Sequence, residues 1–575
     1  MTREKSKIGI LSQNGLILFL FTVFIAVLAW ITYGSLQGVL GMLAYLLVGL
    51  LNLYPWIIPF AGIPLGILDL LGIFGANMYN LTLNLAHLNP SWMPIAWFWI
   101  IVVISSIINL ILSILSLSWL IGLKNRKKEP KTNYALINCN IIDGHKDSSV
   151  IKNGVILIQN LVEEDETPGL IVGVGNSDEI KIPGNYTVID LNGKYVLPGL
   201  INAHCHLTGS GKPTSLTKLS DEWMERLVRI LDTPLGRILL KKMMRSNAIN
   251  ALNAGVTTLK SMSDPIYMDL KVRDEIKEGK YIGPRLICAG KGMCVTGGHG
   301  GVMAYIADSV PEIRKAVRKN LRNGVDFIKI LSTGGVMDAR KVGEAGRPQM
   351  TVEEIETACF ETHRGNLFIS THCESTKGIE EALKGGVDSI EHGADITDEL
   401  IELFKNNPKS LRGFTYLTPT ISAGMGLASL PKKVTKVTDE SKQNAILIEE
   451  GMIKGLRKAY QNGIRFAVGT DASVPYSLQY EVWKELEYFL KYTDMSNQEA
   501  IYHGTKNNAE LLGIDDITGS IEEGKFADLQ IVEGNPLENI GALGEVIHVF
   551  IKGTFLKNPK VEKAKNLKKV EPIEI

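Results

Sequence analysis

The repeated alternation of strand-like and helix-like segments between residues 196 and 513 constrains the fold of this chain most strongly. Short apolar runs such as GVTTLKSM and RFAVGTD are separated by amphipathic stretches such as SVPEIRKAVRKNLRNG. An apolar run bounded by turn residues predicts a buried strand, and a helical apolar period predicts a helix packed on it. About eight repeats of this kind predict a (β/α)8 barrel, in which functional side chains lie at the carboxyl ends of the strands.

Two β-rich segments flank the predicted barrel. Residues 134–195 contain closely spaced apolar runs such as ALINCNII and GVILIQN, and residues 514–575 contain DLQIVEG and EVIHVFIKG. Strands at this spacing predict a small β-sheet domain. We therefore expect one β-sandwich domain, built from both flanks of the barrel.

The first 123 residues are strongly apolar. Uncharged or nearly uncharged stretches cover residues 15–31, 39–74 and 94–123. A membrane span needs about 20 apolar residues, so we interpret residues 1–123 as a helical transmembrane domain and residues 124–133 as a linker. A cleaved signal peptide is the alternative for the first stretch, but no small-residue cleavage site follows it.

Charge and cysteine content predict how this domain is oriented. Basic residues precede the first apolar stretch and follow the last, whereas the loop at 75–93 has none. Because basic flanks mark the cytoplasmic side, we expect an even number of spans, namely four, with the barrel in the cytoplasm. All six cysteines lie beyond residue 123 in settings typical of reduced thiols, which favours the same side. The alternative of three spans, with a bent middle helix, would place the barrel on the opposite side of the membrane.

A pair of histidines follows the first strand-like run of the barrel, in VLPGLINAHCHLTG. Residues two apart in an extended strand point to the same side, so His204 and His206 can reach one metal ion while Cys205 points away. Further polar residues occur at equivalent places. Lys329 lies inside the apolar run DFIKILSTGG, where a lysine is costly unless it has a function. Other strand-like runs end in His372, His392 and Asp471.

Together these motifs resemble the amidohydrolase superfamily. The runs LPGLINAHCHL, TGGHGG, GVDSIEHG, GTDA and GSIEEGKFADLQIVEGNP are similar to its imidazolonepropionase-like and prolidase-like branch, over residues 134–555. The resemblance implies a metal-dependent hydrolase of carbon–nitrogen bonds with two metal ions. One ion would be held by His204, His206 and Asp471, the second by His372 and His392, and an N-carboxylated Lys329 would bridge them. Zinc is the expected metal, although these ligands also suit Mn, Fe or Co.

The resemblance also suggests roles around the metals. Asp471 would act as the catalytic base as well as a ligand. His299, in the glycine-rich run TVTGGHGG, is a candidate for holding the substrate carbonyl oxygen. Arg340, Glu374 and Tyr416 are candidate substrate-binding residues, with a solvated loop as the alternative for Arg340. An acid at position 374 departs from the neutral residues that relatives often carry there.

The expected function is hydrolysis of an amide bond in a dipeptide or an N-acyl amino acid. Opening of a cyclic amide or deamination of a ring is the alternative within enzymes, and mononuclear members of that kind do not need Lys329. A non-catalytic membrane binding or assembly module is the alternative outside enzymes. Lys plus Arg and Asp plus Glu each number 61, so no basic surface predicts nucleic acid binding. A small amide or peptide and a lipid bilayer are the expected partners, and homo-oligomers are left open.

Overall fold

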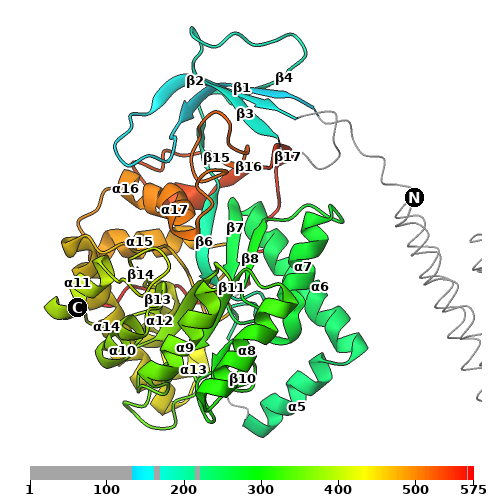
Figure 1. The fold of residues 1–575 in the computed structure, drawn as a ribbon. Helices are drawn as coiled ribbons and strands as arrows, with labels where there is room; N and C mark the ends of the chain where they lie inside the picture. The colour runs from blue at the N-terminus through cyan, green and yellow to red at the C-terminus, as the bar shows by residue number, and fades with distance from the viewer. Residues whose placement is uncertain (1–131, 161–168, 214–220, 566) are drawn as a thin grey trace, which may run out of the picture. The chain divides into compact units, whose positions relative to one another are not determined.

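The computed structural model describes residues 132–160, 169–213, 221–565 and 567–575. They fall in the unit Lys131–Ile575. Figure 1 shows the two parts of the described unit, a β-sheet at the top and a ring of strands with surrounding helices below.

Parallel strands form the ring. Three of them pair in the order β6-β7-β8 and four in the order β11-β12-β13-β14. The two groups meet where Asp326 N donates to Cys288 O at 2.8 Å. The strand bounds are β6 (Leu200–Cys205), β7 (Val256–Ser261), β8 (Arg285–Cys288), β11 (Phe327–Leu331), β12 (Phe368–Cys373), β13 (Ser389–His392) and β14 (Tyr416–Thr418).

An extended segment at residues 464–470 closes the ring between β14 and β6. On one side Ala467 N donates to Leu417 O at 2.7 Å, and on the other Ala203 N donates to Val468 O at 2.9 Å. The segment makes only isolated bridges to its neighbours, among them Leu417 with Phe466. With the seven strands it completes a closed parallel barrel of eight positions.

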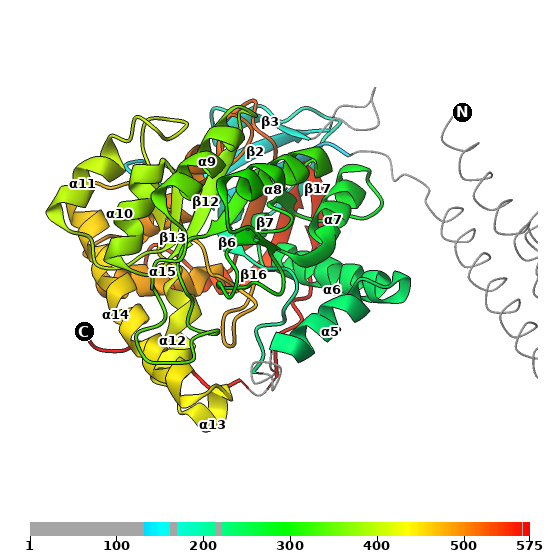
Figure 2. The same ribbon diagram turned by 60° about the horizontal axis from the view of Figure 1, so that its bottom comes forward.

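Helices cover the outside of the ring, as Figure 2 shows. Their ends carry the expected signals: α9 begins with a capping box of Thr351 and Glu354, and α8 ends at Gly324 with φ 77°. The α8 residues that pack inward recur every three or four positions, as in Ile313, Ala316 and Val317. The helices are α5 (Asp221–Leu231), α6 (Pro234–Asn253), α7 (Met268–Lys277), α8 (Val310–Asn323), α9 (Val352–His363), α10 (Thr376–Gly385), α11 (Asp398–Lys405), α12 (Ile421–Ser429), α13 (Lys432–Thr435), α14 (Asp439–Asn462), α15 (Val482–Tyr492), α16 (Asn497–Tyr502) and α17 (Asn508–Leu512).

Short elements complete the loops at the ends of the barrel strands. The loop after β8 contains two strands of two residues each, which pair in parallel. A π-helical turn joins α16 to α17. These elements are β9 (Met293–Cys294), β10 (Tyr305–Ile306), η2 (Pro265–Tyr267), η3 (His503–Asn507) and η4 (Ile540–Gly544).

Both flanks of the barrel contribute to one eight-stranded sheet, in the order β17-β16-β15-β5-β1-β2-β3 with β4 beside β1. The join is the antiparallel pairing of β5 with β15, from Pro198 opposite Leu529 to Tyr195 opposite Val532. The two flanks therefore form a single hydrogen-bonded sheet, where the prediction was a β-sandwich. Its strands are β1 (Tyr134–Ile141), β2 (Ile151–Gln159), β3 (Leu170–Asn176), β4 (Thr187–Asp190), β5 (Tyr195–Pro198), β15 (Leu529–Val532), β16 (Val546–Ile551) and β17 (Thr554–Lys557).

The predicted transmembrane domain requires a correction. The four spans expected over residues 1–123 lie outside the described residues, and in the described part no helix has both the length and the apolar character to cross a membrane. The physical reason is charge: the long helix α6 has 20 residues but carries four basic ones, Arg237, Lys241, Lys242 and Arg245. The fold class of the described residues is therefore mixed α/β without a membrane domain, and the expected multi-pass location with a cytoplasmic barrel is not supported.

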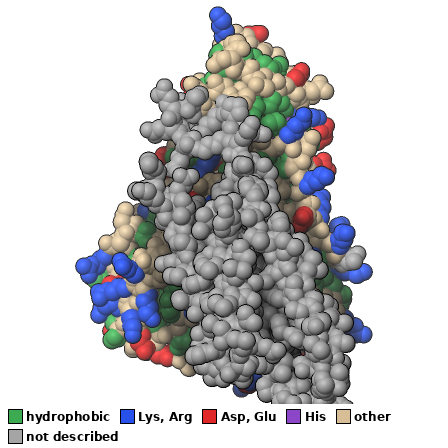
Figure 3. Space-filling view, turned by 90° about the vertical axis from the view of Figure 1, so that its right-hand side faces the viewer, with side chains coloured by type: hydrophobic (Ala, Val, Ile, Leu, Met, Phe, Trp, Pro, Cys, Tyr) green, Lys and Arg blue, Asp and Glu red, His purple; other side chains and the backbone are tan. Residues whose placement is uncertain are grey.

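Surface charge is mixed on the part of the described unit that Figure 3 shows, where basic and acidic side chains both line the edges. The predicted domain boundaries at 134–195, 196–513 and 514–575 stay predictions, since the described residues form one unit.

Candidate metal centre

The histidine pair and Asp471 meet at the carboxyl end of the barrel. Asp471 Oδ1 lies 3.2 Å from both His204 Nε2 and His206 Nε2. Burial alone would raise the pKa of Asp471, but the two imidazoles hold that pKa well below its usual value. The segment at 464–470 can approach β6 closely because Gly469 has no Cβ, which would otherwise come within 2.6 Å of His204 Cβ. Asp471 itself has φ 48°, a backbone strain typical of functional sites.

The other two predicted histidines lie next to this group. The ring centroid of His392 is 5.0 Å from that of His204 and 4.6 Å from that of His372. His392 Nδ1 pairs with Thr420 Oγ1 at 2.7 Å, which fixes the ring and leaves Nε2 for a ligand. Burial lowers the pKa of both His372 and His392 well below the ordinary value, so both rings are neutral, as metal ligation requires.

These donors fit a divalent metal ion. One ligand atom each from His204, His392 and Asp471 lies within 4.8 Å of the others. Mixed imidazole and carboxylate donors at this spacing suit zinc and related ions. The described residues thus contain a site that can hold a metal ion.

The setting of Lys329 is independent evidence for a functional site at the histidine cluster. Its side chain is 2% exposed, and its Nζ has no hydrogen-bond partner among the described residues. Burial lowers the pKa of Lys329 to about 8, which leaves part of the amine neutral near physiological pH. A buried nitrogen left without a partner fits a residue whose natural state is modified or ligated.

A second buried lysine has a different setting. Lys260, on β7, is also 2% exposed, but its Nζ donates to Ser370 Oγ at 2.9 Å and to Tyr416 OH at 3.2 Å. It lies 3.6 Å from Glu391 Oε1, so it is a paired cation. Of these two lysines, only Lys329 has a side-chain nitrogen without a hydrogen-bond partner among the described residues.

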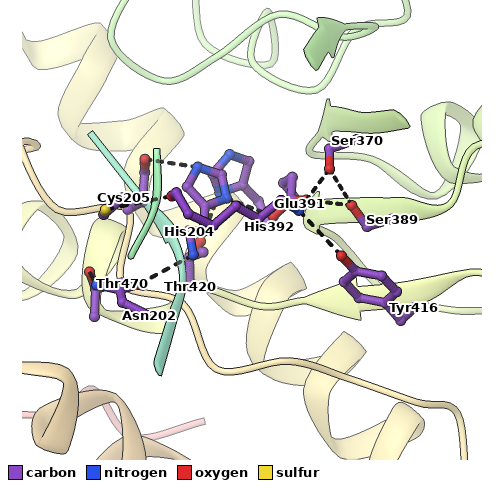
Figure 4. Close-up of polar contacts among 12 residues, drawn as sticks. Asn202, His204, Cys205, Ser370, Ser389, Glu391, His392, Tyr416, Thr420 and Thr470 are labelled. Atoms are coloured by element: carbon purple, nitrogen blue, oxygen red, sulfur yellow. Dashed lines mark hydrogen bonds and ion pairs between the residues drawn. The ribbon is translucent and has the colours of Figure 1, made fainter. Parts of the chain in front are cut away.

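Glu391 was not predicted as a site residue. Figure 4 shows it facing His204, and its Oε2 lies 2.7 Å from His204 Nδ1. Ser389 Oγ donates to the other carboxylate oxygen at 2.6 Å. Such a bond holds Nδ1–H and leaves the lone pair of His204 Nε2 towards Asp471. The sequence signal for Glu391 was its position directly before His392. Regular strand alternation would place the two side chains on opposite faces, so Glu391 was not expected at the site. The φ of 70° at His392 breaks that alternation.

Of the remaining candidates, two lie beside the histidines. The ring centroids of His299 and His372 are 4.2 Å apart, and His299 Nδ1 lies 2.5 Å from Asp338 Oδ2. Burial would lower the pKa of His299, but Asp338 raises it above the ordinary value. Glu374 Oε2 lies 3.7 Å from His372 Nε2, and burial raises the pKa of Glu374 to about 8.

Tyr416 and Arg340 lie elsewhere. The hydroxyl of Tyr416 is buried against Lys260, and so belongs to the support of Glu391. Arg340 is exposed in the loop between β11 and α9, where its backbone N donates to Glu344 Oε2 at 2.6 Å. Their predicted contacts with substrate stay predictions.

Comparisons with known proteins agree on the family. The model of the amidohydrolase family matches residues 195–556, more than half of the chain. Ochratoxinase of Aspergillus niger is 28% identical over 342 residues, which cover 54% of this chain and 67% of that enzyme. The crystal structure of a candidate prolidase from Bifidobacterium longum matches with 34% identity and a TM-score of 0.66, over 76% of this chain and 98% of that one. A Xaa-Pro dipeptidase with bound methionine in its active site matches with 29% identity and a TM-score of 0.62, over 74% and 100%.

The chain therefore belongs to the amidohydrolase family. The prediction of a hydrolase acting on carbon–nitrogen bonds is confirmed. The superfamily is metal-dependent, and the site of His204, His392 and Asp471 agrees with that property.

Proposed function

We propose that this protein is a binuclear metal-dependent amidohydrolase that cleaves the amide bond of a dipeptide or an N-acyl amino acid. The observation that carries the proposal is the buried, unpartnered Nζ of Lys329 beside the histidine cluster. A mononuclear site needs no such lysine, whereas an N-carboxylated Lys329 would be an anionic ligand that helps to hold two ions. Relatives described as a candidate prolidase and a Xaa-Pro dipeptidase support a peptide-type amide.

In this proposal two ions would be held by His204, His206 and Asp471 on one side and by His372 and His392 on the other, with Lys329 between them. Two divalent ions in such a site, expected to be zinc, would lower the pKa of water and polarise a carbonyl group. The protein residues would then transfer protons and orient the substrate. Asp471 would accept a proton and return it to the leaving nitrogen; the position of its Oδ1, 3.2 Å from the Nε2 atoms of His204 and His206, supports this role.

Two further groups would shape the site. His299, raised in pKa by Asp338, can donate a hydrogen bond to the substrate carbonyl oxygen. Glu391 holds His204 in one tautomer, and Lys260 with Ser389 holds Glu391. The site thus consists of groups that face substrate and groups that keep them in place.

The test is Lys329→Ala. We expect amide hydrolysis to fall by at least about 100-fold, because loss of a bridging ligand disturbs both ions, and a short carboxylic acid should restore part of it. Elemental analysis should find two metal equivalents in the parent protein and fewer in the variant. Lys260→Met is the matched control, since it removes a buried lysine that has partners and should give no rescue by the acid. Full activity of Lys329→Ala with one tightly held ion would overturn the binuclear proposal.

A further inference from the structure

Glu374, the residue directly after β12, carries a buried carboxylate that the fold leaves without a partner. The residue is 8% exposed, and its Oε2 has no hydrogen-bond partner among the described residues. A buried polar group without a partner is costly, so proteins rarely keep one unless a ligand or a function requires it. Glu374 therefore needs an explanation that the proposed metal ligands do not give.

The main chain, rather than a side-chain contact, holds this residue. Glu374 N donates to Thr333 Oγ1 at 3.1 Å. The loop between β11 and α9 packs onto the Glu374 carbonyl at Gly346, where a Cβ would come within 2.4 Å of that oxygen. Gly346 also has φ 79°, a conformation that favours glycine. These contacts fix the main chain of Glu374 beside the loop between β11 and α9, and they leave the side-chain Oε2 for another group.

Asp338, another acid near the histidines, differs from Glu374 in having hydrogen-bond partners. Asp338 Oδ2 is satisfied within the protein, by His299 Nδ1 at 2.5 Å and by Gly300 N at 2.8 Å. Glu374 Oε2 instead lies 3.7 Å from His372 Nε2, which is too far for a hydrogen bond. Glu374 therefore stands beside a proposed metal ligand with an acceptor to offer.

We propose that Glu374 binds the free α-ammonium group of the substrate, so that the substrate is a dipeptide or related amide with an unblocked amino terminus; this inference rests on the proposed function. An ammonium group has three donors and no acceptor, and its positive charge favours the ionised form of Glu374, in which both oxygens act as acceptors. In such an amide one carbon separates the ammonium nitrogen from the carbonyl carbon. The ammonium can therefore reach Glu374 while the carbonyl lies at the histidine cluster.

The same geometry excludes the other substrate class of the proposal. An N-acyl amino acid presents a hydrocarbon chain beside its scissile carbonyl, with no donor for Glu374. The buried carboxylate would then stay unpaired and desolvated, which disfavours binding.

The experiment compares leucyl-alanine with N-acetyl-leucyl-alanine on the full-length, metal-loaded protein. We expect kcat/KM to be about 10- to 100-fold higher for the free amine, the range expected for a hydrogen bond to a charged group. Glu374→Gln should reduce this ratio to near one while the metal content stays unchanged. Glu344→Gln is the matched control, because its Oε2 already accepts the backbone N–H groups of Arg340 and Lys341 and the ratio should not change.

Three outcomes would overturn the inference. The first is equal cleavage of the two substrates by the parent protein, and the second is an unchanged ratio in Glu374→Gln. The third is loss of bound metal in that variant, which would make Glu374 a metal ligand. If neither substrate is cleaved, the proposed function fails by itself. Calorimetric binding of leucinamide and N-acetyl-leucinamide then decides the inference: tighter binding of leucinamide that Glu374→Gln abolishes supports it, and equal binding overturns it.

Discussion

At the scale of single residues, Glu391 joins two parts of the centre. Its carboxylate lies 2.7 Å from His204 Nδ1 and 3.6 Å from Lys260 Nζ. Glu391→Gln should keep the volume but loosen the His204 ring, so we expect metal affinity to fall by about 10- to 100-fold. Titration against a competing chelator measures this. The matched variant Glu361→Gln removes a carboxylate that is 5% exposed but paired with Arg318 at the outer helices, and should leave the affinity unchanged. Equal affinities of the Glu391 variant and the parent would contradict the role given to Glu391.

The predictable part of the site consists of polar residues that end apolar runs. His204, His392 and Asp471 were found in this way, because a polar residue at the end of a buried strand indicates a function. Lys260 and Glu391 also lie inside strands, but single-residue alternation could not say which face each would take. Their importance comes from contacts between β7, β12 and β13, far apart in sequence. Such pairings are not visible in one sequence.

At the scale of elements, the segment at 464–470 stands where a barrel strand would be, yet polar side chains support it. Asn508 Oδ1 accepts Val468 N at 2.9 Å, and Asn508 Nδ2 donates to Ile201 O at 2.8 Å. The ring of His503 stacks on Phe466 with centroids 4.3 Å apart. The apolar run RFAVGTD predicted an extended segment here. Its contacts with η3 and α17 could be seen only in the structure. This support positions the backbone that leads to Asp471.

The stacked His503 predicts a pH dependence of this element. Burial lowers the pKa of His503 to about 4, from 6.5. The unfolded chain therefore binds the proton more readily, and stability falls as pH drops from about 6.5 to about 4. The shift corresponds to a loss of about 3 kcal/mol. His503→Phe should keep the ring stack and make the dependence less steep, as measured by thermal unfolding at several pH values, while the buried His372 and His392 keep their own contribution. An equal slope in the two proteins would exclude His503 as its source, and an unchanged Tm at pH 7 would verify the stack.

At the scale of the whole molecule, metal binding should stabilise the fold. The proposed ligands come from β6, β11, β12, β13 and the segment before Asp471, so ions would link positions around the whole ring. A ligand that binds only the folded state adds about 4 kcal/mol at 1,000 times its Kd. Chelator treatment should therefore lower Tm in differential scanning calorimetry, and zinc should restore it. His392→Ala should show a smaller chelator effect, whereas an equal effect would place the stabilising metal elsewhere.

The mixed α/β character of the described residues was predictable because the alternation of strands and helices is a long, repeated signal, whereas the membrane part of the predicted fold class was wrong. Apolarity by itself was a weaker guide, since the described helices α6 and α14 are long but charged. We expected the two flanks to join because both consist of closely spaced apolar runs. The pairing of β5 with β15, which fixes the register of that join, depends on contacts across more than three hundred residues.

That join has a consequence for synthesis on the ribosome. Strand β5 emerges early, but its neighbour β15 follows only after the entire barrel has been translated. Until then the nascent chain carries β5 with one row of backbone groups unpaired, an edge that favours wrong pairing. A slow-growing polypeptide would thus depend on the barrel, or on a chaperone, to shield this edge until the last strands arrive.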